Sequence, residues 1–125
     1  MILIIDFGSQ TAHLIGRRLR SLGVAVEYTD PEDALATIKT NQPKGIILSG
    51  GPASVYEKGA PTISPAIYNV GIPILGICFG QQLTAHLLGG TVKPGTVKEY
   101  GPAMLELNSK SGLFAHYAKV YIKGF

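Results

Sequence analysis

Short apolar runs alternate along this chain with segments in which apolar residues recur every three or four positions. The first run occupies residues 2–5 and stops at a polar, glycine-containing turn at 6–9. The segment that follows spaces its leucine and isoleucine residues at helical intervals and ends at Gly23. This change of period predicts a buried strand followed by an amphipathic helix, and glycine is a typical residue for closing a helix.

The same cycle repeats up to residue 90. A second helix is expected to begin with Asp30 as its N-cap and Pro31 at its first position, and to stop before Pro43. A last helix starts immediately after the fourth apolar run and closes at Gly89. The predicted strands cover residues 2–5, 24–28, 45–48 and 72–77, and weaker extended pieces are expected at 91–93 and 103–107.

Strands that are apolar on both faces and alternate with helices indicate a parallel sheet covered by helices on both sides. The predicted fold class is therefore α/β, doubly wound, with a mostly parallel sheet. In such sheets the reactive groups gather in the loops that follow the carboxyl ends of the strands. Three loops are candidates for that role, namely 6–10, 49–54 and 76–82.

Composition narrows the function classes. The chain has 125 residues, of which 46% are hydrophobic and 15% charged, which suits one globular domain and excludes a disordered tail. The net charge is +3, and the basic residues are scattered along the chain. The excess positive charge lies in the second half, where no acidic residue follows Glu106. Because no basic stripe is present, we expect no nucleic-acid partner.

Cys78 is the only cysteine in the sequence. A single thiol excludes an internal disulfide and a multi-thiolate metal site. The pattern contains neither a signal peptide nor a run long enough to cross a membrane. We therefore expect a cytoplasmic protein without a membrane partner.

The segment Gly76-Ile77-Cys78-Phe79-Gly80 lies between a predicted buried strand and a helix. It follows the logic of the G-x-S-x-G nucleophile elbow, with sulfur in place of oxygen. Glycines two residues before and after Cys78 permit a strained turn that exposes the side chain, and the helix N-terminus favours the thiolate. The backbone N–H of Phe79 would then lie where an oxyanion forms. The alternative for a lone cysteine is a buried structural role.

The loop at 49–54, Ser-Gly-Gly-Pro-Ala-Ser, admits three interpretations. Its glycines could offer a second backbone N–H to an oxyanion opposite Cys78, because both loops follow strands at the same edge. It could cradle a phosphate, but Ala53 stands where the pyrophosphatase loop of ATP-using synthetases carries aspartate, and no basic residue is near. It could also be a plain turn after a strand.

A cysteine nucleophile normally needs a base, and the sequence has three histidines. His86 lies eight residues after Cys78 on the same predicted helix, about 12 Å along its axis, and is out of reach. His13 falls near the start of the first helix, where a packed or solvated role is commoner. His116 falls in the late basic segment and is not placed. The sequence therefore assigns no base.

Four motifs in order make the chain resemble the class I glutamine amidotransferases, most closely the GMP-synthase branch of that family. The resemblance covers about residues 1–115 and implies a flavodoxin-like form of the doubly wound fold. The motifs are Ile4-Ile5-Asp6-Phe7-Gly8-Ser9-Gln10, the stretch from Gly45 to Val55, the stretch from Gly76 to Gln82, and Lys98-Glu99-Tyr100-Gly101-Pro102-Ala103.

The resemblance also implies an activity. Cys78 would attack the side-chain carboxamide of glutamine, release ammonia and leave a glutamyl thioester that water hydrolyses. Gly51 and Phe79 would supply the backbone N–H groups of the oxyanion hole, while Gln82 and Gly50 would bind the substrate. The ammonia would pass to a synthetase domain or subunit that uses ATP and magnesium to aminate xanthosine monophosphate to GMP. The glutaminase domain itself would need no cofactor and no metal.

The chain departs from the family after residue 115. The family takes its catalytic histidine and glutamate from a later His-Pro-Glu segment, whereas here Tyr117 and Ala118 follow His116. We therefore expect residues 1–115 to form a partial domain, incomplete at its C-terminus, and residues 116–125 to be a non-family tail. A premature stop, a frameshift or a degenerate gene copy would each produce such a chain.

Two functional hypotheses follow. The leading one is the glutaminase part of GMP synthase, which would be inactive alone because the histidine and glutamate are missing. The alternative is a non-catalytic glutamine-binding or regulatory subunit that docks on a synthetase.

Overall fold

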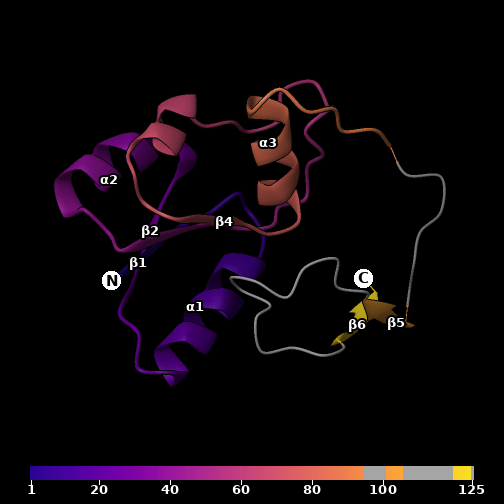
Figure 1. Ribbon diagram of the computed structural model, residues 1–125, viewed down its shortest axis with the longest axis horizontal. Helices are drawn as coiled ribbons and strands as arrows, with labels where there is room; N and C mark the ends of the chain where they lie inside the picture. Colours follow the sequence, from indigo (N-terminus) through magenta and orange to yellow (C-terminus); the bar gives the residue numbers. More distant parts are fainter. Residues whose placement is uncertain (95–100, 106–119, 125) are drawn as a thin grey trace. The chain divides into compact units, whose positions relative to one another are not determined.

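A computed structural model describes residues 1–94, 101–105 and 120–124 (Figure 1). The chain divides into two compact units, Met1–Lys93 and Pro94–Phe125. The first unit contains, in chain order, β1 (Ile2–Ile5), α1 (Thr11–Ser21), β2 (Val26–Thr29), the 3₁₀ helix η1 (Pro31–Asp33), α2 (Ala34–Asn41), β3 (Gly45–Leu48), the 3₁₀ helix η2 (Pro65–Asn69), β4 (Ile74–Gly76) and α3 (Phe79–Leu87).

The four strands of this unit form one parallel sheet in the order β2-β1-β3-β4. Figure 1 shows α1 on one face of the sheet, and α2, η2 and α3 on the other. The register aligns Ile5 with Leu48, and Leu48 with Gly76, so these strands end at one common edge. The predicted doubly wound α/β fold is confirmed, and its carboxyl edge brings the loops after β1, β3 and β4 together.

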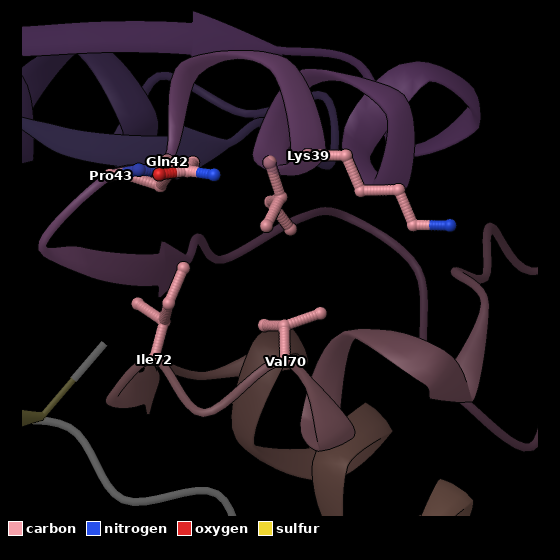
Figure 2. Close-up of a pocket in the computed structure, with 6 residues that line it drawn as sticks. Lys39, Gln42, Pro43, Val70 and Ile72 are labelled. Atoms are coloured by element: carbon pink, nitrogen blue, oxygen red, sulfur yellow. The ribbon is translucent and has the colours of Figure 1, made fainter.

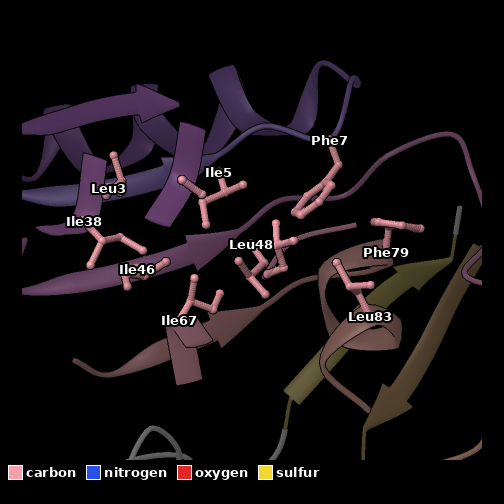
Figure 3. Packing of buried hydrophobic residues seen from close by; sticks show 11 residues of the cluster. Leu3, Ile5, Phe7, Ile38, Ile46, Leu48, Ile67, Phe79 and Leu83 are labelled. Atoms are coloured by element: carbon pink, nitrogen blue, oxygen red, sulfur yellow. The ribbon is translucent and has the colours of Figure 1, made fainter. Parts of the chain in front are cut away.

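The main core lies between the sheet and the α2–α3 layer (Figure 3). Alternation along β1 explains it, because Leu3 and Ile5 face this layer while Ile4 is buried on the α1 side with Ala12. Each buried leucine or isoleucine contributes about 1.5–3 kcal/mol. The cluster consists of Leu3, Ile5, Phe7, Ala34, Ile38, Ile46, Leu48, Ile63, Ile67, Phe79 and Leu83.

Several predicted boundaries shift in the structure. The second strand begins two residues later than expected, and the fourth is confined to Ile74–Gly76. Asp30 does occupy an N-cap position, but its side chain accepts no capping hydrogen bond, and the 3₁₀ turn η1 precedes α2. The helix ends before Pro43 as predicted, with Gln42 in the left-handed conformation at φ 46°. The short helix η2 was not predicted.

The second unit contains an antiparallel pair, β5 (Gly101–Leu105) with β6 (Val120–Gly124). The extended piece expected at 103–107 therefore starts earlier, and 106–107 lie outside the described residues. Residues 91–93, expected as a weak extended piece, form no strand. The expected boundary between 115 and 116 also lies outside the described residues and stays a prediction. Among the helices described, none is long and apolar enough to span a membrane.

Candidate active site

Cys78 stands at the junction between β4 and α3, as the N-cap residue of the helix. Its backbone has φ 53° and ψ −113°, a conformation that costs a non-glycine residue about 1–3 kcal/mol. The side chain is exposed. The strained strand-to-helix turn expected from the sequence is therefore present, while a structural role in the core is not. Its role as nucleophile stays a prediction.

The two glycines that flank Cys78 allow this turn to pack against its neighbours. A Cβ at Gly76 would lie 2.7 Å from the carbonyl oxygen of Gly80. A Cβ at Gly80 would collide with the carbonyl oxygen of Leu48, at the end of β3. Both obstacles are backbone atoms, so only glycine lets the elbow lie this close to the sheet.

Ser49 links the elbow to the other loops of the carboxyl edge. It follows β3 directly and is completely buried. Its carbonyl oxygen accepts from Gly80 N–H at 3.1 Å, and its Oγ accepts from Phe7 N–H at 3.1 Å. Ile77 N–H donates to the neighbouring carbonyl of Leu48 at 3.0 Å. These bonds hold the elbow, the β1 loop and the β3 loop in one arrangement.

The glycine loop after β3 lies directly against the elbow. A Cβ added at Gly50 would come within 3.4 Å of Cys78 Cβ. Within the described part of the chain, neither Gly51 N–H nor Phe79 N–H finds a hydrogen-bond acceptor. Two free backbone donors thus belong to the loops that flank the thiol. An oxyanion hole needs backbone donors of this kind, and the assignment of Gly51 and Phe79 to it stays a prediction.

Gln82 lies half-buried in the first turn of α3. Its Oε1 accepts from Val55 N–H at 3.5 Å, which connects the helix to the segment after the glycine loop. The side chain therefore comes from the same helix turn that carries Cys78. Its expected role in holding substrate, like that of Gly50, is untested.

The histidines are not brought to the thiol within the described residues. His86 is exposed in the last turn of α3, at the end opposite to Cys78. His13 packs its ring on Tyr28 of β2, with ring centroids 5.0 Å apart, and β2 is at the opposite edge of the sheet from β4. His116 lies outside the described residues. The missing base expected from the sequence is therefore not supplied by His13 or His86.

A groove of about 630 Å³ lies elsewhere in this unit, between α2 and the segment that leads from η2 into β4 (Figure 2). Its walls are mainly apolar, and Lys39 and Gln42 are its polar members. It adjoins the residues that precede β3 and β4, the edge opposite to Cys78.

The described residues also hold no cluster of three histidine, cysteine or acidic side chains suited to a metal. We therefore take the carboxyl edge of the sheet, which carries the exposed Cys78, as the candidate site.

Sequence reasoning missed three hydroxyls at this edge. Ser9, Thr11 and Ser49 all contact the carbonyl oxygen of Gly50. Only the position of Ser49, directly after a buried strand, gave a local signal. The other two come from the β1 loop and the start of α1, forty or so positions away.

Comparisons with known proteins complete the description. A family model described as glutamine amidotransferase class-I matches residues 3–124. A glutamine-hydrolyzing GMP synthase from Staphylococcus aureus strain JH9 is 56% identical over 115 residues, 92% of this chain and 22% of that protein. The enzyme of the same name from Staphylococcus carnosus strain TM300 is 54% identical over 114 residues, 91% of this chain and 22% of that protein.

A crystal structure of a candidate GMP synthase subunit from Thermoplasma acidophilum is similar in fold, with a TM-score of 0.81 and 25% identity. The match covers 98% of this chain and 62% of that chain. Compared with the Staphylococcus enzymes, this chain spans about a fifth of the length of each relative.

Proposed function

This chain belongs to the class I glutamine amidotransferase family, and from that premise we propose that it forms the nucleophile-bearing part of a glutaminase for GMP synthesis. Glutamine would be hydrolysed through a thioester on Cys78, and the ammonia would be used by an ATP-dependent synthetase domain or subunit. The observation that carries the proposal is the exposed Cys78 thiol at φ 53°, between two loops whose Gly51 and Phe79 N–H groups find no acceptor among the described residues.

The first step is attack of the Cys78 thiolate on the side-chain amide carbon of glutamine. A carbon–sulfur bond forms, and the amide oxygen takes the electron pair of its double bond. Phe79 N–H and Gly51 N–H are the donors for this oxyanion. Loss of one such donor typically slows the reaction about 10²–10³-fold.

The second step breaks the carbon–nitrogen bond. The electron pair of the oxyanion re-forms the carbonyl, the nitrogen takes up a proton and ammonia leaves. Water then adds to the thioester, glutamate departs and the Cys78 thiol is regenerated. Gln82 and Gly50 are the residues proposed to hold the substrate during these steps.

Proton transfer is the part of the reaction for which neither histidine of the described residues is in place. A general base typically contributes about 10²–10⁴-fold, or roughly 3–5.5 kcal/mol of barrier. His13 stacks on Tyr28, and His86 is at the far end of α3. We infer that this chain alone forms the thioester at most once and does not turn over.

Ammonia release from glutamine by the purified chain tests this function, with Cys78→Ala as the blank. We expect a single Cys78-dependent burst, no larger than the protein concentration, followed by no steady rate. Sustained turnover would show that a base is present and would contradict the inactivity. Calorimetric glutamine binding without any burst would favour the non-catalytic binding subunit instead.

A further inference from the structure

The carbonyl oxygen of Gly50 is contacted by three side-chain hydroxyls. Ser49 Oγ donates to it over 2.9 Å, Ser9 Oγ over 3.0 Å and Thr11 Oγ1 over 3.2 Å. The hydroxyls of Ser9 and Thr11 also lie 2.6 Å apart, so one of them donates its proton to the other. Only the second proton of this pair is then left to donate to the Gly50 carbonyl. Together with Ser49, this supplies two hydrogen bonds, as many as the two lone pairs of a carbonyl accept.

The direction of this carbonyl determines the direction of Gly51 N–H. The two groups belong to one peptide unit, which is planar and trans, and therefore they point to opposite sides of it. The unit lies between two glycines, so no Cβ opposes its rotation by half a turn. Some other interaction has to select one orientation.

The hydroxyls are themselves held in place. Ser49 is completely buried, and its Oγ accepts from Phe7 N–H at 3.1 Å while it donates to Gly50. Ser9 Oγ accepts from Thr11 N–H at 3.2 Å. With their acceptor sides occupied by backbone donors, these hydroxyls direct their protons at the Gly50 carbonyl.

We propose that Ser9, Thr11 and Ser49 are positioning residues that hold the Gly50 carbonyl away from the substrate and thereby turn Gly51 N–H toward the oxyanion at Cys78. The inference rests on the proposed function and adds residues that the reaction itself does not touch. When a hydroxyl is lost, the peptide unit turns over more easily. A carbonyl oxygen would then face the developing oxyanion and repel it, where an N–H would stabilise it.

Two electrophiles separate this effect from a general change at the thiol. Iodoacetamide is attacked at a saturated carbon, so no oxyanion forms. The second probe is a glutamine analogue in which a chloromethyl group replaces the amide nitrogen. The Cys78 thiolate adds to its carbonyl through an oxyanion and ends bonded to the methylene carbon, while chloride leaves with the bonding electron pair.

The main variant is the double change Ser9→Ala with Thr11→Val, which leaves the buried Ser49 in place, because either hydroxyl alone can still donate its proton to the Gly50 carbonyl. For the chloromethyl ketone we expect the maximal inactivation rate to fall about 10-fold in the double variant, part of the 10²–10³-fold value of a complete donor. The half-saturating concentration and the iodoacetamide rate should stay unchanged. Thr11→Ser in the Ser9→Ala background keeps one hydroxyl and should restore the rate. Thr37→Val is the matched control, since the Thr37 hydroxyl lies 3.2 Å from Thr29 Oγ1 on the β2–α2 side, away from Gly50.

The outcomes are distinguishable. An unchanged maximal rate in the double variant would overturn the positioning role, and so would equal losses with both electrophiles. If the unaltered chain shows no saturation with the chloromethyl ketone, the proposed glutaminase function fails together with this inference. If the double variant does not fold, Ser9→Ala with Thr11→Ala takes its place, because Ser9 lies in a loop outside any helix or strand and alanine has a high helix propensity at Thr11 in α1.

Discussion

The two loops that meet at Cys78 are held in place by different means. The elbow is set by backbone packing, because Gly76 and Gly80 lie against carbonyl groups that leave no room for a Cβ. The Gly50–Gly51 loop is set by side chains, because hydroxyls hold its carbonyl. We therefore expect side chains added at Gly76 or Gly80 to lower stability, and the loss of hydroxyls around the glycine loop to lower reactivity more than stability.

Gly80→Ala should have the largest effect on stability. The new Cβ would collide with the Leu48 carbonyl, a backbone atom, and overpacking of this kind costs about 1–3 kcal/mol or more. The better helix propensity of alanine offsets about 1 kcal/mol of it. We expect a net loss of about 2 kcal/mol in the free energy of unfolding, measured by urea denaturation.

Gly45→Ala is the matched control for that variant. Its Cβ would meet the end of the flexible Ile2 side chain at 2.9 Å, which can move aside. We expect a loss below about 1 kcal/mol. Equal losses at Gly45 and Gly80 would show that the elbow is not held by backbone packing.

Gly50→Ala should have an intermediate effect. Its Cβ would lie 3.0 Å from Thr11 Oγ1 and 3.4 Å from Cys78 Cβ, both of which are side-chain atoms. We expect a loss of about 1.5 kcal/mol, and about 0.5 kcal/mol less when Thr11 is already alanine. A double-mutant cycle by denaturation measures this coupling, and strictly additive losses would refute the contact.

Cys78→Gly should stabilise the chain while it removes the thiol. Glycine adopts the observed φ of 53° without the strain that cysteine carries there. Relative to Cys78→Ala, which keeps a Cβ, we expect a gain of about 1 kcal/mol. Thermal or urea unfolding of the two variants side by side measures it. Equal stability would mean that the elbow stores no strain at this residue.

The smallest expected effect on stability concerns Tyr68 of η2. Its hydroxyl lies 2.9 Å from Thr84 Oγ1, and the Thr84 hydroxyl donates to the Gly80 carbonyl. Burial raises the pKa of Tyr68 above its ordinary value of 10.0, and the hydrogen bond with Thr84 lowers it in part. The folded state then holds this proton more tightly than the unfolded state. Stability should therefore fall as the pH rises above about 10.

Urea denaturation at several pH values between about 9 and 11 measures the slope of the unfolding free energy against pH. Tyr68→Phe should flatten it, whereas Tyr56→Phe, at an exposed tyrosine, should not. An unchanged slope in Tyr68→Phe would assign the loss of stability to other groups.

Much of the candidate site could be predicted from short stretches of sequence. The spacing of Gly76, Cys78 and Gly80 was enough to predict a strained, exposed cysteine between a strand and a helix, and the structure has it. Asp30 was expected to cap the second helix, but it is the N-cap of the 3₁₀ turn η1 without a side-chain hydrogen bond, and Asp33 is the N-cap of α2. The strand β6 could not be predicted, since its pairing with β5 joins segments that carry no strong local signal.

The sequence by itself determined the elements that depend on near neighbours: the apolar runs of the parallel strands, the helical spacing and the glycines of the elbow. The tertiary structure alone decided how the loops are joined. Ser9 and Thr11 reach the Gly50 carbonyl across 41 and 39 positions, because the sheet places β1 beside β3 with their ends in register. Hydrogen bonds between such distant residues depend on strand order, and strand order results from the packing of the whole sheet rather than from any local pattern.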